Sequence, residues 1–490
     1  VVGPADDDDD DDPEVVVVRG GQQEARGAES GGAYYLENHV AFLDAEREFH
    51  YDRASRTLRY YARQNETLDD ASIVASHLAT LVDVANASNV AFRNLTFAHT
   101  RPTFLESYRV PSGGDWAIHA SAALRASDGV AGLRVEDCVF DSLGGNALLV
   151  EGRAEATRVA RTDFVRVGAS GVVLLGRTRY DDGDVADDDD DDTAKIPALM
   201  DGRTNANVPA NTTVEACRFR EIGVYEKQTA GVVQFLAART TVRDSVFFNG
   251  PRAAINLNDG FYGDHLVDRC LLFNWVRETS DHGALNTWDR QPYASTAAPD
   301  DDDDDPYHVA ALPSRVTRSF VVNNYAGNWP LDHDDGSQHF VDTANVLVWG
   351  GAKNYEGFEK QSLGNAYINV DLGRKGQDGC AMDDSHGAHD TFANNTCLVV
   401  KGKLYSAKPC NSSNLNDTMP ASANNRFYTT GAETSIPCDG DTATFTLREY
   451  QDQFGMDLGS TVAELPDAVG VLAIVSTLLG LPQPPPPAAA

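Results

Sequence analysis

Two short polar blocks between Ser280 and Ser337 combine residue types that can carry out acid–base chemistry. The first block runs from Asp281 to Arg290 as Asp-His-Gly-Ala-Leu-Asn-Thr-Trp-Asp-Arg, and the second runs from Asp332 to Ser337 as Asp-His-Asp-Asp-Gly-Ser. Two carboxyl groups that share a site can divide the roles of proton donor and charged partner, as glycosidic bond hydrolysis requires. The flanking sequence reads as short apolar strands, so we expect a rigid frame that presents a site.

We predict that Asp281 forms a catalytic pair with Asp334 or Asp335. Alignment of the two blocks on Arg269 and Arg318 places these carboxylates on neighbouring coils, roughly 5 to 10 Å apart, because adjacent strands lie about 4.8 Å apart. That interval includes the separations of both retaining and inverting glycosidases, so the stereochemistry stays open. The choice between Asp334 and Asp335 stays open as well.

Polar and aromatic residues in and around the two blocks are expected to bind substrate. Asn and Asp at coil corners often bond only their own backbone, so a structural role is the simpler explanation for any single one of them. The density of the group favours a functional site, because it exceeds what turns require; the group consists of Asp281, Asp332, Asp334, Asp335, His282 and His333. The predicted substrate-binding residues are Asn256, Asn258, Asp259, His282, Trp288, Arg290, His333, Glu356, Lys360, Asp383, Asp384 and His386.

The charge of the chain excludes nucleic acid as a partner. The 490 residues carry a formal net charge of −34, whereas phosphate binding needs clustered Lys and Arg. Three unbroken runs, Asp6 to Asp12, Asp187 to Asp192 and Asp300 to Asp305, supply 19 of the 74 acidic residues. Such runs repel themselves and bury no apolar surface, so we interpret them as disordered loop insertions.

A phrase of alternating apolar and polar residues recurs and predicts the fold. Where no insertion intervenes it returns about every 25 residues, which is one coil of a strand solenoid and shorter than the roughly 40 residues of a propeller blade. We therefore predict an all-β chain that forms a single-stranded, right-handed parallel β-helix of about ten coils. The phrases begin at Asn89, Leu133, Val214, Val242, Val267, Val316 and Asn394.

The seven cysteines are assigned by their place in this phrase. Cys138, Cys217, Cys270 and Cys397 are predicted to stack at one repeat position as small core residues rather than as disulfides or metal ligands. Cys410 and Cys438 lie outside the repeat and are candidates for a disulfide, which would leave Cys380 unpaired.

The predicted organisation has four segments. Residues 1–32 form a partly disordered acidic segment, and residues 33–85 form a hairpin, turning at Asp52 to Arg56, that caps the first coil. Residues 86–405 form the β-helix, with insertions near 178–205 and 291–312. Residues 406–490 form a C-terminal cap, with a helix near Val469 to Leu481, and a tail rich in Pro and Ala.

The Glu37-Asn-His block, followed by Phe-His-Tyr-Asp-Arg and Leu-Arg-Tyr-Tyr, resembles the entry segment of right-handed β-helix carbohydrate-active proteins of the pectin-lyase-like superfamily. The blocks at Asp281 and His333 are similar to the paired aspartate segments of glycoside hydrolase family 141 and its relatives. This resemblance implies hydrolysis of plant or algal polysaccharide by two acidic residues, which correspond to Asp281 and to Asp334 or Asp335. The Asp insertions and His282 depart from the family pattern.

Two other functions stay open. Asp332, Asp334 and Asp335 could hold calcium beside Arg290 or Lys360 in a polysaccharide lyase, which is the one cofactor considered. Alternatively, the face could bind glycans without turnover. We expect a secreted or extracellular monomer without a membrane anchor, which fits seven N-x-S/T sequons at Asn65, Asn86, Asn94, Asn211, Asn394, Asn411 and Asn416.

Overall fold

The computed structural model describes sixteen stretches of the chain and separates it into two units, Val1–His77 and Leu78–Ala490. The three acidic runs, predicted to be disordered insertions, lie outside the described residues. The described residues are 37–67, 73–104, 106, 118–177, 208–259, 263–279, 282–288, 312–323, 329–370, 379–383, 389–400, 403–407, 411–415, 419–431, 434–439 and 442–485.

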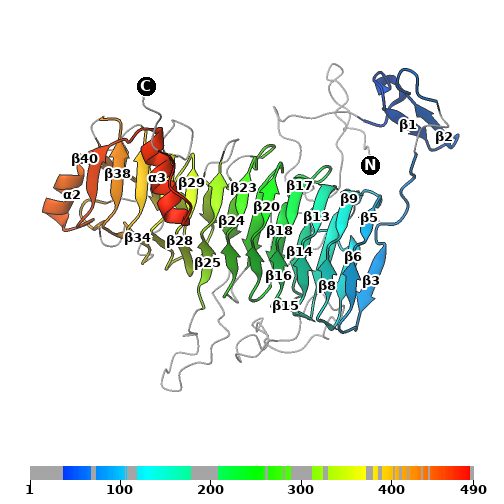
Figure 1. The fold of residues 1–490 in the computed structure, drawn as a ribbon, viewed down its shortest axis with the longest axis horizontal. Coiled ribbons are helices and arrows are strands. Elements are labelled where there is room, and N and C mark those ends of the chain that lie inside the picture. The colour runs from blue at the N-terminus through cyan, green and yellow to red at the C-terminus, as the bar shows by residue number, and fades with distance from the viewer. Residues whose placement is uncertain are drawn as a thin grey trace, which may run out of the picture. The chain divides into compact units, whose positions relative to one another are not determined.

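The second unit is a parallel β-helix, as predicted (Figure 1). Each coil contributes one short strand to each of three long parallel sheets, and the strands of each sheet follow one another in chain order. Sheet 1 has eleven strands: β3 (Val82–Ala85), β6 (Ala122–Ser127), β10 (Asn146–Glu151), β14 (Val172–Leu175), β18 (Ala230–Phe235), β21 (Ala253–Asn258), β24 (Leu285–Trp288), β27 (Leu331–Asp334), β30 (Ala352–Asn354), β33 (Ala381–Asp383) and β36 (Ser406–Ala407).

Sheet 2 also has eleven strands: β4 (Ala91–Arg93), β8 (Arg134–Glu136), β12 (Arg158–Ala160), β16 (Thr213–Glu215), β19 (Thr241–Arg243), β22 (Leu266–Asp268), β25 (Ser314–Thr317), β28 (Phe340–Thr343), β31 (Gln361–Leu363), β34 (Thr391–Ala393) and β37 (Ala421–Ala423). Sheet 3 has twelve: β5 (Thr96–Ala98), β9 (Val139–Leu143), β13 (Asp163–Val167), β17 (Arg218–Ile222), β20 (Val246–Phe248), β23 (Leu271–Phe273), β26 (Phe320–Val322), β29 (Val346–Val348), β32 (Ala366–Val370), β35 (Thr396–Val399), β38 (Arg426–Thr429) and β41 (Thr461–Glu464). Three two-residue strands, β7 (Val130–Ala131), β11 (Ala154–Glu155) and β15 (Pro209–Ala210), form a small parallel sheet.

The corner between sheets 2 and 3 explains why the phrase recurs. Each corner begins with a residue at positive φ, such as Asp137 or Asn394, and the next residue points inward. At most corners that next residue is a small Cys, Ser, Thr or Asn whose side chain bonds the backbone of the preceding coil: the cysteines donate to a carbonyl oxygen, and Ser, Thr and Asn accept a backbone N–H. In this way Ser245 bonds the N–H of Cys217, and Asn395 bonds the N–H of Asn365. One corner therefore bonds to the next along the stack.

Stacked phenyl rings fill the interior beneath sheet 3. Phe97, Phe140, Phe164, Phe219 and Phe247 occupy one position of successive coils, with ring centroids 4.5 to 5.0 Å apart. This distance matches the spacing of neighbouring strands, so each ring packs flat on the next.

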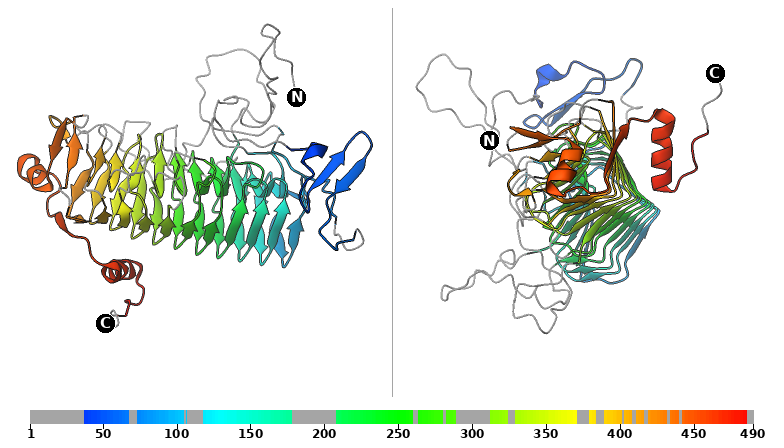
Figure 2. Two further views of the ribbon diagram at one scale, coloured as in Figure 1. Left: turned by 90° about the horizontal axis from the view of Figure 1, so that it is seen from above. Right: turned by 90° about the vertical axis from the view of Figure 1, so that its left-hand side faces the viewer.

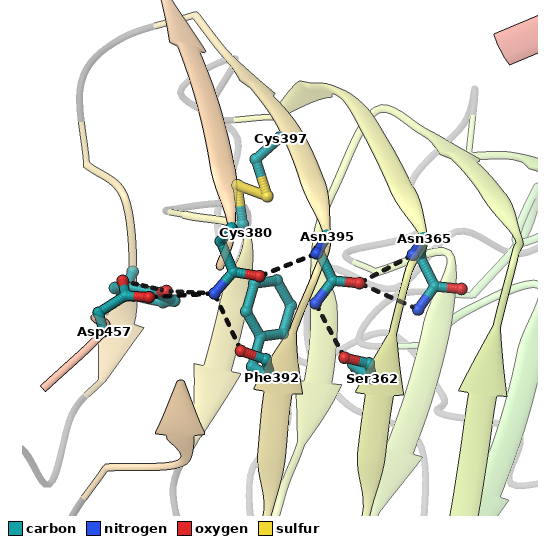
Figure 3. The surroundings of a disulfide bond; sticks show 9 residues. Ser362, Asn365, Cys380, Phe392, Asn395, Cys397 and Asp457 are labelled. Carbon is teal, nitrogen blue, oxygen red and sulfur yellow. Dashed lines mark hydrogen bonds between the residues drawn. A yellow bond between two sulfur atoms is a disulfide. The ribbon is translucent and has the colours of Figure 1, made fainter. Parts of the chain in front are cut away.

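The cysteine prediction was correct for three residues and wrong for the fourth. Cys138, Cys217 and Cys270 are buried free thiols at the inward corner position. Cys397 pairs with Tyr367 in the register of sheet 3 and thus lies in the column that continues the phenyl stack, while Asn395 takes the corner. Cys397 forms a disulfide with Cys380, which the sequence had left unpaired (Figure 3). Cys410 lies outside the described residues.

Helices α2 (Leu447–Phe454) and α3 (Ala468–Leu479) belong to the described part of the C-terminal end of the unit. Helix α2 follows the antiparallel hairpin of β39 (Ile436–Cys438) and β40 (Ala443–Phe445), and it contributes Leu447 and Tyr450 to the core. Helix α3 is the predicted apolar helix, but it packs on the outer face of sheet 3 rather than over the end of the stack (Figure 2). No helix of the described chain has the length and apolar character needed to cross a membrane.

The first unit contains the predicted hairpin. A 3₁₀ turn, η2 (Val40–Phe42), precedes the antiparallel strands β1 (Phe49–Asp52) and β2 (Thr57–Tyr60). Asp52 accepts hydrogen bonds from the backbone N–H groups of Ala54 and Ser55, which fixes the turn. The proposed capping of the first coil stays a prediction.

Candidate active site

Sheet 1 carries the candidate site on its outer face. Strand β27 pairs with β24, which places Asn286 opposite Asp332 and Trp288 opposite Asp334. Alternate side chains of a strand point to opposite faces, and Leu331 belongs to the buried core of the coil. Asp332 and Asp334 therefore both point outward, two residues apart on one strand.

Lys353 of strand β30 lies between these two carboxylates. Its Nζ atom is 2.5 Å from Asp334 Oδ1 and 3.2 Å from Asp332 Oδ1. Because one nitrogen contacts both, the two oxygens lie no more than about 6 Å apart, close enough to influence each other's ionisation. The side chain of Asp332 is fully buried, whereas that of Asp334 is 23% exposed. The pair thus combines one enclosed and one accessible carboxyl group.

Burial dominates the ionisation of Asp332. It raises the pKa of Asp332 to about 6 despite the attraction of Lys353, and the negative charge of Asp334 acts in the same direction as burial. Two further donors reach Asp332 Oδ2, namely the backbone N–H of Gly283 at 3.1 Å and the Asn286 amide at 2.9 Å. A side chain at position 283 would place its Cβ 2.8 Å from the Asp332 Cβ, so only glycine allows this approach.

Lys353 keeps its charge in this setting. Burial opposes the charge, but attraction to Asp332 and Asp334 outweighs burial and raises the pKa of Lys353 above its usual value. The ammonium also lies 4.8 Å from the ring centroid of Trp329 and 5.2 Å from that of Tyr355. The site therefore holds a permanent cation beside a carboxyl group that can gain a proton near neutral pH.

The structure places His333 in the interior rather than on the substrate face where the sequence analysis expected it. Its ring is fully buried, with Nδ1 2.9 Å from Thr287 Oγ1 and Nε2 2.8 Å from Asp342 Oδ2. Lys360 is buried as well, and its Nζ contacts the Ser337 carbonyl at 3.1 Å and Asp390 at 3.3 Å. Neither side chain can reach a glycan on the outer face of sheet 1.

The remaining predicted residues are spread over the same region. Asn256 and Asn258 lie on strand β21, and Asn258 pairs in register with Trp288 of the next strand. Both asparagine side chains are buried, and neither amide has a hydrogen-bond partner. Trp288 packs edge-on against Phe235, with ring centroids 6.3 Å apart.

Further predicted residues lie in turns or beyond the described chain. Asp259 is buried after β21, His282 is half-buried beside Gly283, Asp335 is half-buried after β27, and Glu356 is exposed after β30. Asp383 is placed only by its backbone in β33. Asp281, Arg290, Asp384 and His386 lie outside the described residues, so the predicted pairing of Asp281 stays a prediction.

Sequence reasoning missed Lys353 and the catalytic potential of Asp332. The family resemblance pointed to Asp334 or Asp335, and Asp332 was considered only as a possible calcium ligand. The alternation Leu331-Asp-His-Asp334 was the available signal, since a strand here sends both outer Asp residues to one face. Lys353 occurs in the short segment Ala-Lys-Asn354, which carries no comparable pattern.

Nothing in the described chain brings three His, Cys, Asp or Glu side chains together as a metal site. Between Asp332 and Asp334 the cation is the ammonium of Lys353. The predicted use of calcium stays a prediction.

Comparison with solved structures returns β-helix proteins at low similarity, while no known protein family and no curated protein sequence matches the chain. A structure described as a glycoside hydrolase is 19% identical, with a TM-score of 0.49 over 68% of this chain; the match spans 57% of that protein's length. The A-module of the mannuronan C-5 epimerase AlgE6 of Azotobacter vinelandii is 8% identical, with a TM-score of 0.35 over 78% of this chain and 91% of that one. The catalytic unit of a GH87 α-1,3-glucanase of Streptomyces thermodiastaticus is 10% identical, with a TM-score of 0.28 over 78% of this chain and 64% of that one. At these values, function must be argued from the site itself.

Proposed function

We propose that this chain is a secreted glycoside hydrolase that acts on a plant or algal polysaccharide through Asp332 and Asp334. The observation that carries the proposal is the pairing of two carboxyl groups with one lysine on the outer face of sheet 1, where burial raises the pKa of Asp332 to about 6. Two neighbouring carboxyl groups with different environments are the arrangement that assigns acid and base roles.

Each residue of the site has a distinct role in this proposal. Asp334 is the accessible carboxylate that acts on the sugar as base or nucleophile, held by the ammonium of Lys353. Asp332, with its pKa raised to about 6, can take up and release a proton at mildly acidic pH and serves as the acid of the pair. The Gly283 N–H and the Asn286 amide fix the Asp332 carboxyl through Oδ2. Trp288 and the two unpartnered asparagines of β21 lie next along the sheet, where a glycan chain would continue.

A polysaccharide screen with the full chain tests this function. Reducing sugar and unsaturated product are measured in parallel on neutral and acidic plant and algal polysaccharides, with and without a chelator. Release of reducing sugar without unsaturated product supports hydrolysis. Unsaturated product that is lost with the chelator indicates the lyase, and binding without any product indicates a glycan-binding protein.

Substitution of the carboxyl groups then tests the assignment. Asp332→Asn and Asp334→Asn keep the size of the side chain but remove its ionisation, and each should lower turnover about a hundredfold or more. Asp281→Asn examines the predicted alternative partner. Asp137→Asn is the control, because Asp137 pairs with Arg161 at the corner between sheets 2 and 3, where both side chains are more than 40% exposed. Near-full turnover in Asp332→Asn together with loss in Asp281→Asn would move the acid role to Asp281.

A further inference from the structure

A chain of hydrogen bonds crosses the interior beneath the two site carboxylates. Ser337 Oγ lies 2.6 Å from the backbone carbonyl oxygen of Asp334 and 2.8 Å from Thr287 Oγ1. Thr287 Oγ1 in turn lies 2.9 Å from His333 Nδ1, and His333 Nε2 lies 2.8 Å from Asp342 Oδ2. The chain therefore connects sheet 2, through Asp342, to the backbone of Asp334 on sheet 1.

The direction of each bond follows from counting protons. A carbonyl oxygen can only accept, so the single hydroxyl proton of Ser337 is donated to Asp334. Ser337 Oγ must then accept the proton of Thr287, which leaves Thr287 Oγ1 as the acceptor for His333. It follows that Nδ1 of His333 carries a proton. A second proton lies between Nε2 and Asp342, since two acceptors facing each other would not attract.

We infer that His333 is a positioning residue whose protonated Nδ1 completes a directed chain that fixes Asp334 for catalysis. His333 stands between Asp332 and Asp334 on strand β27, so its ring anchors the backbone that carries both carboxylates. The inference rests on the proposed function for its catalytic consequence, whereas the protonation pattern and the anchoring of Asp334 can be measured without activity.

A second interior histidine offers a matched control. His265 is also buried, and its Nδ1 accepts the backbone N–H of Thr240 at 3.2 Å. Nδ1 of His265 is therefore unprotonated, and its proton lies on Nε2, 3.1 Å from the side-chain nitrogen of Gln234. Two donors would face each other there, so the Gln234 amide must be turned to let its oxygen, which has no hydrogen-bond partner among the described residues, accept this proton. His265 and His333 should thus carry opposite protonation at Nδ1, although both lie inside the same β-helix.

Nitrogen NMR of the full chain with labelled histidine tests the protonation pattern. The signals of the two residues are assigned by their loss in His333→Gln and His265→Gln. A protonated Nδ1 in His333 together with an unprotonated Nδ1 in His265 is the expected result. An unprotonated Nδ1 in His333 would overturn the inferred chain.

Kinetics and crystal structures of the variants test the positioning role. His333→Gln and Asp342→Asn should lower kcat tenfold or more with little change in KM, whereas His265→Gln should lose similar stability and keep kcat within about threefold. In crystal structures of His333→Gln and Asp342→Asn, the distance between the Asp334 carboxylate and Lys353 Nζ should be longer than in the natural chain. If that contact and kcat are both unchanged, His333 has no positioning role. If no glycan is hydrolysed by the natural chain, the proposed function fails, while the contact distance still decides the anchoring.

Discussion

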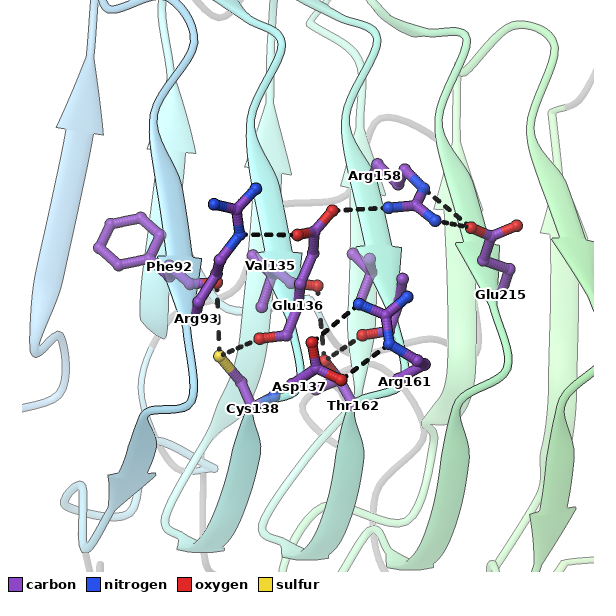
Figure 4. Close-up of polar contacts among 12 residues, drawn as sticks. Phe92, Arg93, Val135, Glu136, Asp137, Cys138, Arg158, Arg161, Thr162 and Glu215 are labelled. Carbon is purple, nitrogen blue, oxygen red and sulfur yellow. Dashed lines mark hydrogen bonds and ion pairs between the residues drawn. The ribbon is translucent and has the colours of Figure 1, made fainter.

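Arg158 and Lys353 each lie between two carboxylates, and their surroundings differ. On sheet 2, Arg158 is 39% exposed and bridges Glu136 and Glu215 (Figure 4). On sheet 1, Lys353 is 5% exposed and bridges Asp332 and Asp334. The same charge arrangement is therefore found both around a half-exposed arginine and around an enclosed lysine.

The difference lies in how many partners each acid has. Glu136 also binds Arg93, and Glu215 also binds Arg243, so the acids of sheet 2 form a ladder of shared partners. The hydrogen bond from Arg93 lowers the pKa of Glu136, which keeps it ionised. Burial instead raises the pKa of Asp332, whose described basic partner is Lys353. Glu136 is itself only 7% exposed, so its arginine partners keep it charged, whereas enclosure with one lysine produces a carboxyl group that can exchange a proton.

Removing the enclosed cation should have the largest effect on stability. Lys353→Met leaves Asp332 buried without its compensating charge, and we expect a loss of about 3 to 5 kcal/mol in the free energy of unfolding. Chemical denaturation at pH 7 measures the loss. Lys353→Arg is the matched variant, since it keeps the charge and should recover part of the stability. An unchanged denaturation midpoint in Lys353→Met would show that Asp332 is not charged in the folded protein.

The fold could be predicted from the sequence because it repeats one local rule many times. Each coil needs a residue at positive φ and then a small inward polar residue, and Asp-Cys, Arg-Cys and Arg-Ser pairs satisfy it visibly. Cys397 was misplaced because Asn395 meets the same need two residues earlier. The sequence around Cys397 matches the recurring phrase, so it does not show that the corner residue is Asn395, two positions earlier.

The site was only partly predictable, since it depends on which face each residue takes. The block from Asp332 to Ser337 was found from its composition, but His333 was assigned to the outer face although strand alternation turns it inward. Lys353 comes from a separate coil, and only the register of sheet 1 brings it opposite Asp332. Such contacts between coils have no spacing signature within one short segment.

The pH dependence of stability should have opposite signs at the two positions. The pKa of Asp332 rises from an ordinary 3.8 to about 6 on folding, so the folded chain binds more protons than the unfolded chain between these values. The contribution of Asp332 to stability is therefore full below about pH 4 and is lost as pH rises to about 6, by roughly 3 kcal/mol. The difference between the natural chain and Asp332→Asn, followed by denaturation from pH 4 to 7, isolates this slope.

Glu136 is the comparison for that slope. Its lowered pKa means that its contribution is present above the ordinary value of 4.5 and is lost as pH falls below it. The difference between the natural chain and Glu136→Gln should thus change in the opposite direction. Equal slopes at both positions would contradict the contrast between Asp332, paired with one lysine, and Glu136, paired with two arginines.

The smallest effect is expected from Arg158→Met on sheet 2. Glu136 keeps Arg93 and Glu215 keeps Arg243 after this change, so no acid is left without a partner. Exposed ion pairs contribute little because water and salt screen them, and we expect a loss below about 1 kcal/mol in the free energy of unfolding. Denaturation of the natural chain and Arg158→Met in low salt measures the loss in the free energy of unfolding. The same comparison in about 1 M salt should show a smaller loss, because salt screens the ion pairs. The opposite outcome is a loss as large as that of Lys353→Met that persists in salt. It would mean that the Arg–Glu ladder of sheet 2 behaves as a buried network, so that enclosure alone would not distinguish the candidate site.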